Sequence, residues 1–144
     1  MTIEQKSLAE MHAVLSQLTH RFFWYLDEFR YQDLVDTMEP EARWHRQGKV
    51  LRGREEALAA LEVRSRTQKI RHVMTNLQIT SLSADEASTV GYMTVYKHDD
   101  GADAPLPRTI GGPSGFLLVR TSFRRHGDQW LISEQAATPE FVCS

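Results

Sequence analysis

Residues 8–31, LAEMHAVLSQLTHRFFWYLDEFRY, carry the pattern of one long amphipathic helix near the start of the chain. Apolar residues recur in this stretch at alternating spacings of three and four, which brings them onto a single stripe of a helix. The run FFWYL, residues 22–26, is apolar on every side, so we expect this part of the helix to be enclosed by protein on two faces. The stripe consists of Leu8, Met11, Leu15, Leu18, Phe22, Tyr25 and Phe29.

The segments that follow predict two shorter helices and then a run of antiparallel strands. A helix should form in QDLVDTM and end at Pro40, because proline cannot continue a helix. This order of elements indicates an α+β fold, in which a bent antiparallel sheet wrapped around the long helix buries its apolar stripe. The other expected elements are a hairpin of residues 42–47 and 49–53, a helix at 54–66, and strands at 70–83, 87–98, 115–125 and 129–137.

The connection between the two middle strands is unusually long. It consists of residues 99–114, DDGADAPLPRTIGGPS, and is rich in glycine and proline. Unstructured loops of this length are uncommon in compact domains, and many of them are lids or binding loops. We therefore expect this loop to cover the mouth of a pocket.

Length, charge and cysteine content restrict the class of protein. With 144 residues the chain is expected to form one domain, residues 1–144, large enough for a core and an internal cavity. The 17 Lys and Arg against 19 Asp and Glu give a formal net charge of −2, which predicts neither nucleic acid nor a membrane surface as a partner. Cys143 is the single cysteine, and we find neither a secretory leader nor an apolar run of membrane-spanning length. We expect a cytoplasmic protein.

The stretch QKIRHVMTNLQIT, residues 68–80, predicts a strand with two different faces. His72, Asn76 and Gln78 alternate onto one face, whereas the other face, with Leu77, is suited to a core. The polar face is either exposed to water or directed into a polar pocket. In a pocket, His72 could take and give protons at neutral pH.

Asp27 lies near the end of the long helix, away from its apolar stripe. At helical spacing it shares a face with Phe23 and Trp24 one turn earlier and with Tyr31 one turn later. An acid among aromatic side chains is partly desolvated, which suits a general acid or base. The alternative is a surface ion pair between Asp27 and Arg30.

Three further residues are candidates for ligand contacts. Arg46, which follows His45 in the run RWHRQ, could bind a carboxylate or an oxyanion, and Tyr92 could donate a phenolic hydrogen bond. A charged edge hairpin and a core tyrosine are the structural alternatives. The chain contains no nucleophile elbow, phosphate-binding loop, dinucleotide-binding motif or zinc-protease motif, and its six histidines lack metal-ligand spacing. We therefore expect neither a metal nor a cofactor.

The order and spacing of five segments across nearly the whole chain resemble the SnoaL-like group of the nuclear transport factor 2-like superfamily. The resemblance implies a cone-shaped fold, in which a bent antiparallel sheet surrounds three helices and an apolar pocket lies at the open end. It also implies a homodimer through the convex face of the sheet, as in many members. The segments are FFWYLDEFRYQDLVDTM, ARWHRQGKVLRGREEALAAL, RHVMTNLQI, GYMTVY and VRTSFRRHGDQWLI.

Scytalone dehydratase is the nearest catalytic template within this resemblance. Its helix-borne aspartate corresponds to Asp27, and one of its two pocket histidines corresponds to His72. Met93 stands where the strand context matches that of the second histidine, and His98, five residues on, is no obvious substitute. The resemblance therefore implies an Asp27–His72 acid–base pair without the second histidine.

The resulting hypothesis is a cofactor-independent acid–base enzyme of the dehydratase, isomerase or cyclase type that acts on an apolar, oxygenated organic compound. His72 is the principal general acid and base in this hypothesis, and Asp27 orients or charges its ring. The alternative is a non-catalytic ligand-binding or assembly module, such as a relative of the small subunit of ring-hydroxylating dioxygenases. The residues expected to contact the substrate are Phe23, Trp24, His45, Arg46, Asn76, Tyr92 and Met93.

Overall fold

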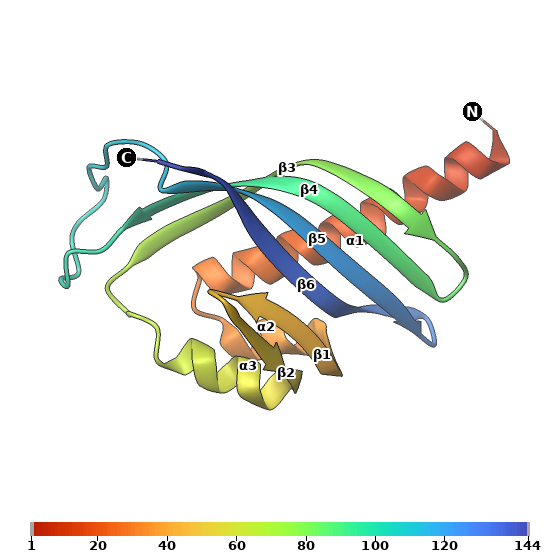
Figure 1. Ribbon diagram of the computed structural model, residues 1–144, viewed down its shortest axis with the longest axis horizontal. Helices are drawn as coiled ribbons and strands as arrows, with labels where there is room; N and C mark the ends of the chain where they lie inside the picture. The colour runs from red at the N-terminus through yellow and green to blue at the C-terminus, as the bar shows by residue number, and fades with distance from the viewer. Residues whose placement is uncertain (1, 144) are drawn as a thin grey trace.

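The computed structural model describes residues 2–143 of the chain. Its helices are α1 (Ile3–Asp27), α2 (Tyr31–Asp36) and α3 (Gly53–Glu62), and its strands are β1 (Met38–Arg46), β2 (Lys49–Arg52), β3 (Lys69–Leu82), β4 (Glu86–His98), β5 (Gly115–His126) and β6 (Gln129–Val142). The strands form one sheet in the order β2-β1-β6-β5-β4-β3. Strands β3–β6 bend over α1, while β1 and β2, at one edge of the same sheet, lie beside α2 and α3 (Figure 1). The predicted α+β fold with a curved sheet around a long helix is confirmed.

The N-terminus of α1 is fixed by a capping box. The backbone N–H of Gln5 donates to the hydroxyl of Thr2 at 3.0 Å, and the backbone N–H of Thr2 donates to the Gln5 side chain at 2.8 Å. Two backbone donors that a helix start would otherwise leave free are thereby satisfied. The helix then runs for 25 residues and ends at Asp27, a candidate site residue.

Protein encloses residues 22–26 on two sides of α1, because the helix packs against both β3 and α2, and Trp24 is the one exposed residue of this run. Phe22 is fully buried, whereas the side chain of Trp24 is 60% exposed. Trp24 continues a stripe of exposed positions, at spacings of three and four, that includes His20 and Arg21. Helical periodicity shows which residues share a face, but it does not show which face the rest of the protein leaves exposed.

The pairing of β1 differs from the predicted antiparallel run. It is antiparallel to β2 but parallel to β6, while β3 to β6 are paired antiparallel. Pro40 lies within β1 and does not end a helix, because α2 already ends at Asp36. The register between β1 and β6 shifts between Met38 and Arg43, so the proline, which has no N–H to donate, lies where the hydrogen-bond ladder is interrupted.

A bulge in β3 determines which of its residues face the helix. The register with β4 shifts between Thr75 and Gln78, so β3 carries an extra residue there. Asn76 in the bulge has a φ of 56°, in the left-handed region that Asn tolerates better than most residues. Gly91 on β4 leaves space for the bulge, since an added Cβ would lie 3.2 Å from the Thr75 carbonyl oxygen. The bulge reverses the alternation, so Leu77 is buried and Asn76 is exposed.

Apolar side chains form a core between α1 and the sheet and also a cluster away from it. Tyr92, Phe116 and Phe141 form this second group, the convex-face aromatic cluster, with ring centroids 5.4 and 5.6 Å apart in succession. Tyr92 and Phe141 are exposed. No helix in the described part of the chain is long and apolar enough to cross a membrane. The largest fully buried core side chains are Phe22, Phe123, Leu15, Leu34, Met38, Leu61 and Ile132.

Candidate functional site

A cavity of about 560 Å³ lies between the concave face of the sheet, the last turns of α1 and the end of α3. This volume is in the range of pockets that bind small molecules. The wall is mixed: twelve of its lining residues are apolar or glycine, and nine carry polar or charged side chains. It is therefore more polar than the usual small-molecule pocket. The apolar part of the wall includes Phe23, Leu26, Trp44, Ile70, Met93 and Leu117.

Asp27 and His72 form a nearly buried carboxylate–imidazole pair at this cavity. The carboxylate accepts from the His72 backbone N–H at 2.9 Å, and its other oxygen lies 2.5 Å from His72 Nδ1. The side chains of His72 and Asp27 are only 10% and 6% exposed. The last residue of α1 is thus tied to β3 by two hydrogen bonds, which hold both the backbone and the ring of His72.

The hydrogen-bond pattern determines what the His72 ring can do. Because the carboxylate of Asp27 can only accept, the proton of a neutral imidazole lies on Nδ1 and the Nε2 lone pair remains available. His72 lines the cavity, whereas Asp27 lies behind it. This arrangement can take up a proton at Nε2, and the carboxylate stabilises the resulting imidazolium.

Phe23 and Met93, which the sequence proposed as pocket residues, line the cavity together with His72. The Phe23 ring stacks on His72 with centroids 5.2 Å apart and an interplanar angle of 29°. Both Phe23 and Met93 are buried. The stacking on Phe23 and the hydrogen bond to Asp27 together restrict rotation of the imidazole ring.

Three residues predicted to contact the substrate lie elsewhere. Trp24 is on the exposed side of α1, Asn76 is turned outward by the bulge in β3, and Tyr92 belongs to the convex-face aromatic cluster. None of them is among the residues that line the cavity. The sequence prediction for Tyr92 failed because Met93, its neighbour in β4, faces inward, and adjacent strand residues face opposite sides.

Arg46 and His45 border the cavity, but their side chains differ in role. Arg46 lines it, as predicted. The His45 ring instead lies 2.8 Å from Glu134, which also pairs with Arg43 at 3.2 Å. Arg43 and His45 alternate with the buried Trp44, so this second pair lies on the other side of β1. His45 therefore does not present its ring to the cavity.

The sequence interpretation missed several polar lining residues. Lys97 follows Met93 and Val95 at strand spacing, so its position could have been inferred once Met93 was known to face inward. Arg64 extends from the end of α3, where its Nη1 donates to the Leu26 carbonyl at 3.0 Å and to a tyrosine hydroxyl. Gln68 and Gln135 also line the cavity. No sequence signal distinguishes these amides from surface glutamines.

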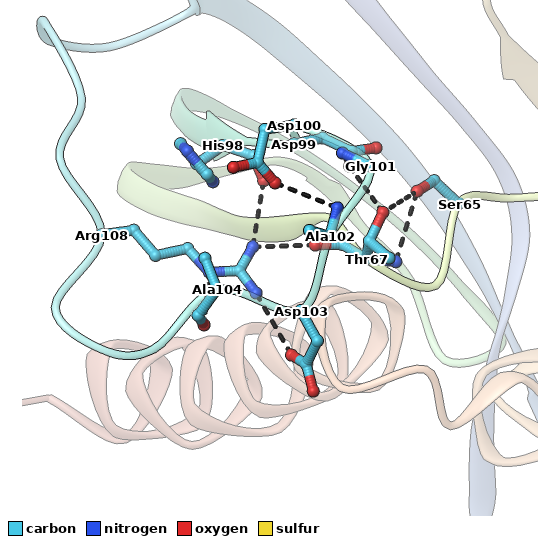
Figure 2. A network of polar contacts seen from close by, with 10 residues as sticks. All are labelled: Ser65, Thr67, His98, Asp99, Asp100, Gly101, Ala102, Asp103, Ala104 and Arg108. Carbon is cyan, nitrogen blue, oxygen red and sulfur yellow. Dashed lines mark hydrogen bonds and ion pairs between the residues drawn. The ribbon is translucent and has the colours of Figure 1, made fainter.

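The loop of residues 99–114 contributes no residue to the cavity lining, so the prediction that it covers the cavity was wrong. Arg108 fixes the loop to the neighbouring strand ends, as Figure 2 shows. Its Nη1 donates to the carbonyl oxygens of Thr67 at 2.8 Å and His98 at 3.4 Å. These contacts hold the loop beside the β3 and β4 ends and away from His72.

Asp99, at the start of this loop, is held by three hydrogen-bond donors. The Ser65 and Thr67 hydroxyls and the Gly101 backbone N–H lower the pKa of Asp99 from 3.8 to about 2. The Thr67 hydroxyl donates at 2.7 Å and the Gly101 N–H at 3.1 Å (Figure 2). Since Ser65 also lines the cavity, this network joins the loop to the cavity edge.

No cluster of three or more His, Cys, Asp or Glu side chains suited to a metal ion occurs within residues 2–143. The chemistry that these residues themselves offer is proton transfer at His72, next to apolar side chains and hydrogen-bonding groups.

A bent sheet around one long helix, with a small-molecule-sized cavity and a carboxylate–imidazole pair beside it, defines the class of cone-shaped α+β pocket proteins. The family model of the SnoaL-like domain matches residues 7–135, which is nearly the whole chain. The protein belongs to the SnoaL-like family, as its sequence predicts.

Solved structures share this fold at low sequence identity. A protein from Catenulispora acidiphila is 22% identical, with a TM-score of 0.76, over 93% of this chain and 94% of that chain. A nuclear transport factor 2-like protein with a cystatin-like fold from Novosphingobium aromaticivorans is 15% identical, with a TM-score of 0.78, over 95% and 86%. A hexachlorocyclohexane dehydrochlorinase is 17% identical, with a TM-score of 0.75, over 94% and 88%. No curated protein sequence matches the chain.

Proposed function

We propose that the protein binds an apolar, oxygenated organic molecule in this cavity and catalyses its dehydration, isomerisation or cyclisation by acid–base chemistry without a cofactor. The observation that carries the proposal is the nearly buried Asp27–His72 pair, whose free Nε2 belongs to a residue lining the cavity. Buried polar groups are costly unless they are paired. A paired base beside a partly apolar cavity is the arrangement that proton transfer to or from a carbon acid requires.

The proton can complete a full cycle on His72 alone. In a dehydration, Nε2 takes a proton from a carbon next to a carbonyl group, and the bond to a hydroxyl on the next carbon breaks as a double bond forms. The imidazolium returns its proton to the departing hydroxide, which leaves as water, and the ring is neutral again. In an isomerisation the ring returns the proton to a different carbon. Asp27 stabilises the charged ring between the two steps.

The fold accommodates a related reaction in another protein. The hexachlorocyclohexane dehydrochlorinase has the same fold, and its name describes an elimination. Such an elimination also includes the loss of a proton from carbon, which a positioned base can accept as the leaving group departs. This likeness supports the proposal at the level of reaction class, while the Asp27–His72 geometry supports it at the level of residues.

The test is a turnover assay on a panel of β-hydroxy carbonyl and β,γ-unsaturated carbonyl compounds, after native mass spectrometry has identified any molecule that co-purifies. His72→Gln and Asp27→Asn should each lower kcat by about 10²- to 10⁴-fold, the usual contribution of a positioned general acid or base. His20→Gln is the matched control, because His20 is exposed and does not line the cavity.

Two outcomes contradict the catalytic proposal. One is a retained organic ligand with no turnover anywhere on the panel, which supports a non-catalytic binding or assembly module. The other is turnover that survives both His72→Gln and Asp27→Asn. Thermal melting of each variant shows whether a loss of activity comes from a loss of folding.

A further inference from the structure

Three cationic side chains line the cavity, although the chain as a whole carries a net charge of −2. Arg46 comes from the end of β1, Arg64 follows α3, and Lys97 lies near the end of β4. None of the described residues that line the cavity is Asp or Glu. Cations that line a cavity without carboxylates create a locally positive potential that attracts an anion.

Arg46 and Arg64 have no carboxylate counter-ion in the part of the chain that the structure describes. Arg43, by contrast, pairs with Glu134. Lys97 is close enough to Asp99 to contribute to the lowered pKa of that carboxyl group. The two guanidinium groups are therefore the uncompensated charges of the cavity.

The positive charges of Arg46 and Arg64 act on each other. Burial, together with the nearby positive charge of Arg64, lowers the pKa of Arg46. Both causes disfavour a charged guanidinium, and an anion bound next to it would offset them. A negatively charged ligand therefore suits the space beside these two arginines.

Contacts with the protein position the two arginines without neutralising them. Nη1 of Arg64 donates to the Leu26 carbonyl at 3.0 Å and to the Tyr31 hydroxyl at 2.9 Å. Arg46 lies over the Trp44 ring at 5.7 Å, and its Nη1 makes one long contact with a glutamine side chain at 3.5 Å. In the described part of the chain, Nε and Nη2 of both groups have no hydrogen-bond partner, and these are the atoms with which a guanidinium binds a carboxylate.

The cavity also contains a buried amide with an unsatisfied group. Gln135 is 2% exposed and lines the cavity, and its Nε2 has no hydrogen-bond partner within residues 2–143. A buried donor without an acceptor is costly and rare in proteins. A ligand oxygen in the cavity would provide the missing acceptor after a rotation of the amide. This is a second, independent sign that the cavity is built for an oxygen-bearing ligand.

We propose that the ligand is an apolar organic acid, whose carboxylate binds between Arg46 and Arg64 while its apolar body lies along the cavity wall toward His72. The inference rests on the proposed function in so far as it takes the same cavity as the substrate site. It adds the substrate class, a monocarboxylate, and it assigns Arg46 and Arg64 as the residues that select for it.

The test compares a matched pair of probes, 2-naphthoate and its neutral methyl ester, by isothermal titration calorimetry. The wild-type protein should bind 2-naphthoate about 10-fold or more tightly than the ester, the low end of what a hydrogen bond to a charged group contributes. Arg46→Gln should abolish most of this preference, while Arg120→Gln should keep it. Arg120 is exposed on β5 and lines no part of the cavity, so this control removes the same charge from elsewhere.

A salt titration of the wild-type protein adds a readout that needs no variant. Binding of 2-naphthoate should weaken as salt screens the guanidinium groups, whereas binding of the ester should not. Equal affinities for the two probes, no binding of 2-naphthoate, or an unchanged preference in Arg46→Gln would overturn the inference. A preference for the anion without turnover by the protein would contradict only the catalytic proposal, so the two failures are distinguishable.

Discussion

Replacing Asp27 by Asn should destabilise the protein and also remove most of the energetic coupling between α1 and the His72 ring. In the structure the carboxylate accepts two hydrogen bonds, one from the His72 backbone N–H and one from Nδ1, while it is 6% exposed. An Asn side chain has a single acceptor oxygen, so one of the two buried donors loses its acceptor. The expected cost is about 1–3 kcal/mol in the free energy of unfolding.

His72→Phe provides the second edge of a double-mutant cycle. Phenylalanine keeps the stacking on Phe23 and the backbone N–H bond to Asp27, but it removes Nδ1 and leaves one carboxylate oxygen unpaired. Leaving a buried hydrogen-bond acceptor without its donor costs about 1–3 kcal/mol, and more where the acceptor is charged. The cycle with Asp27→Asn therefore isolates the contact between the carboxylate and Nδ1, and its coupling energy should be about 2 kcal/mol.

The assay is equilibrium urea unfolding of the four proteins at neutral pH, with the slope against urea checked for constancy. The His45–Glu134 pair supplies a control cycle with the same chemistry, because it is 41% and 32% exposed and spans 2.8 Å. Exposed pairs contribute about 0–1 kcal/mol, so this cycle should give a clearly smaller coupling. A coupling at Asp27–His72 below about 0.5 kcal/mol, the level of simple additivity, would refute the argument that the carboxylate charges and orients the ring.

Three further predictions concern the surroundings of the site. Gly91→Ala should cost about 1–3 kcal/mol by urea unfolding, because the new Cβ would lie 3.0 Å from Met74 Cε and 3.2 Å from the main-chain carbonyl oxygen of Thr75, so that the bulge would have to shift. Asp99→Asn should make Tm depend less on pH in the acid range. Because its pKa is lowered, ionised Asp99 stabilises the folded protein above pH 3.8, and this stabilisation is lost as the pH falls through about 2. The Tm of the wild-type protein should therefore fall more steeply than that of Asp99→Asn between these pH values. We also propose that the convex-face aromatic cluster packs against a second copy of the chain, so Phe141→Glu should shift a dimer to a monomer in light scattering, and a monomeric wild type would contradict this.

Local patterns in the sequence predicted most of the elements, because helix and strand periods are local properties. The long N-terminal helix, the hairpin around Gly48 and the four long strands were placed within a few residues of their observed bounds. The pairing of Asp27 with His72 needed more, since 45 residues separate them. The sequence pattern suggested a role for each residue separately, and the resemblance to the family implied that the two form an acid–base pair.

The features that sequence analysis missed depend on contacts between distant segments. The parallel pairing of β1 with β6 joins residues near 44 to residues near 135, and no local pattern encodes it. The outward turn of Asn76 follows from one extra residue in β3, which requires Gly91 on the next strand to leave space. A single inserted residue moves every later side chain to the other face, so face predictions on long strands are only as good as the assumed register.

The acid–base pair and the arginines have a common consequence if the ligand is an organic acid. Removing a proton from a carboxylate-bearing molecule adds a second negative charge, which is unfavourable in a partly apolar cavity. Arg46 and Arg64 would bind the carboxylate, which is the first charge. The same fixed cations would stabilise the second negative charge as it develops during proton transfer. Asp27 keeps its own charge behind His72 and outside the cavity lining, so it stabilises the imidazolium without repelling the substrate directly. Selection of the substrate and stabilisation of the transition state then depend on the same two guanidinium groups, so Arg46→Gln should lower kcat as well as raise KM for the acid.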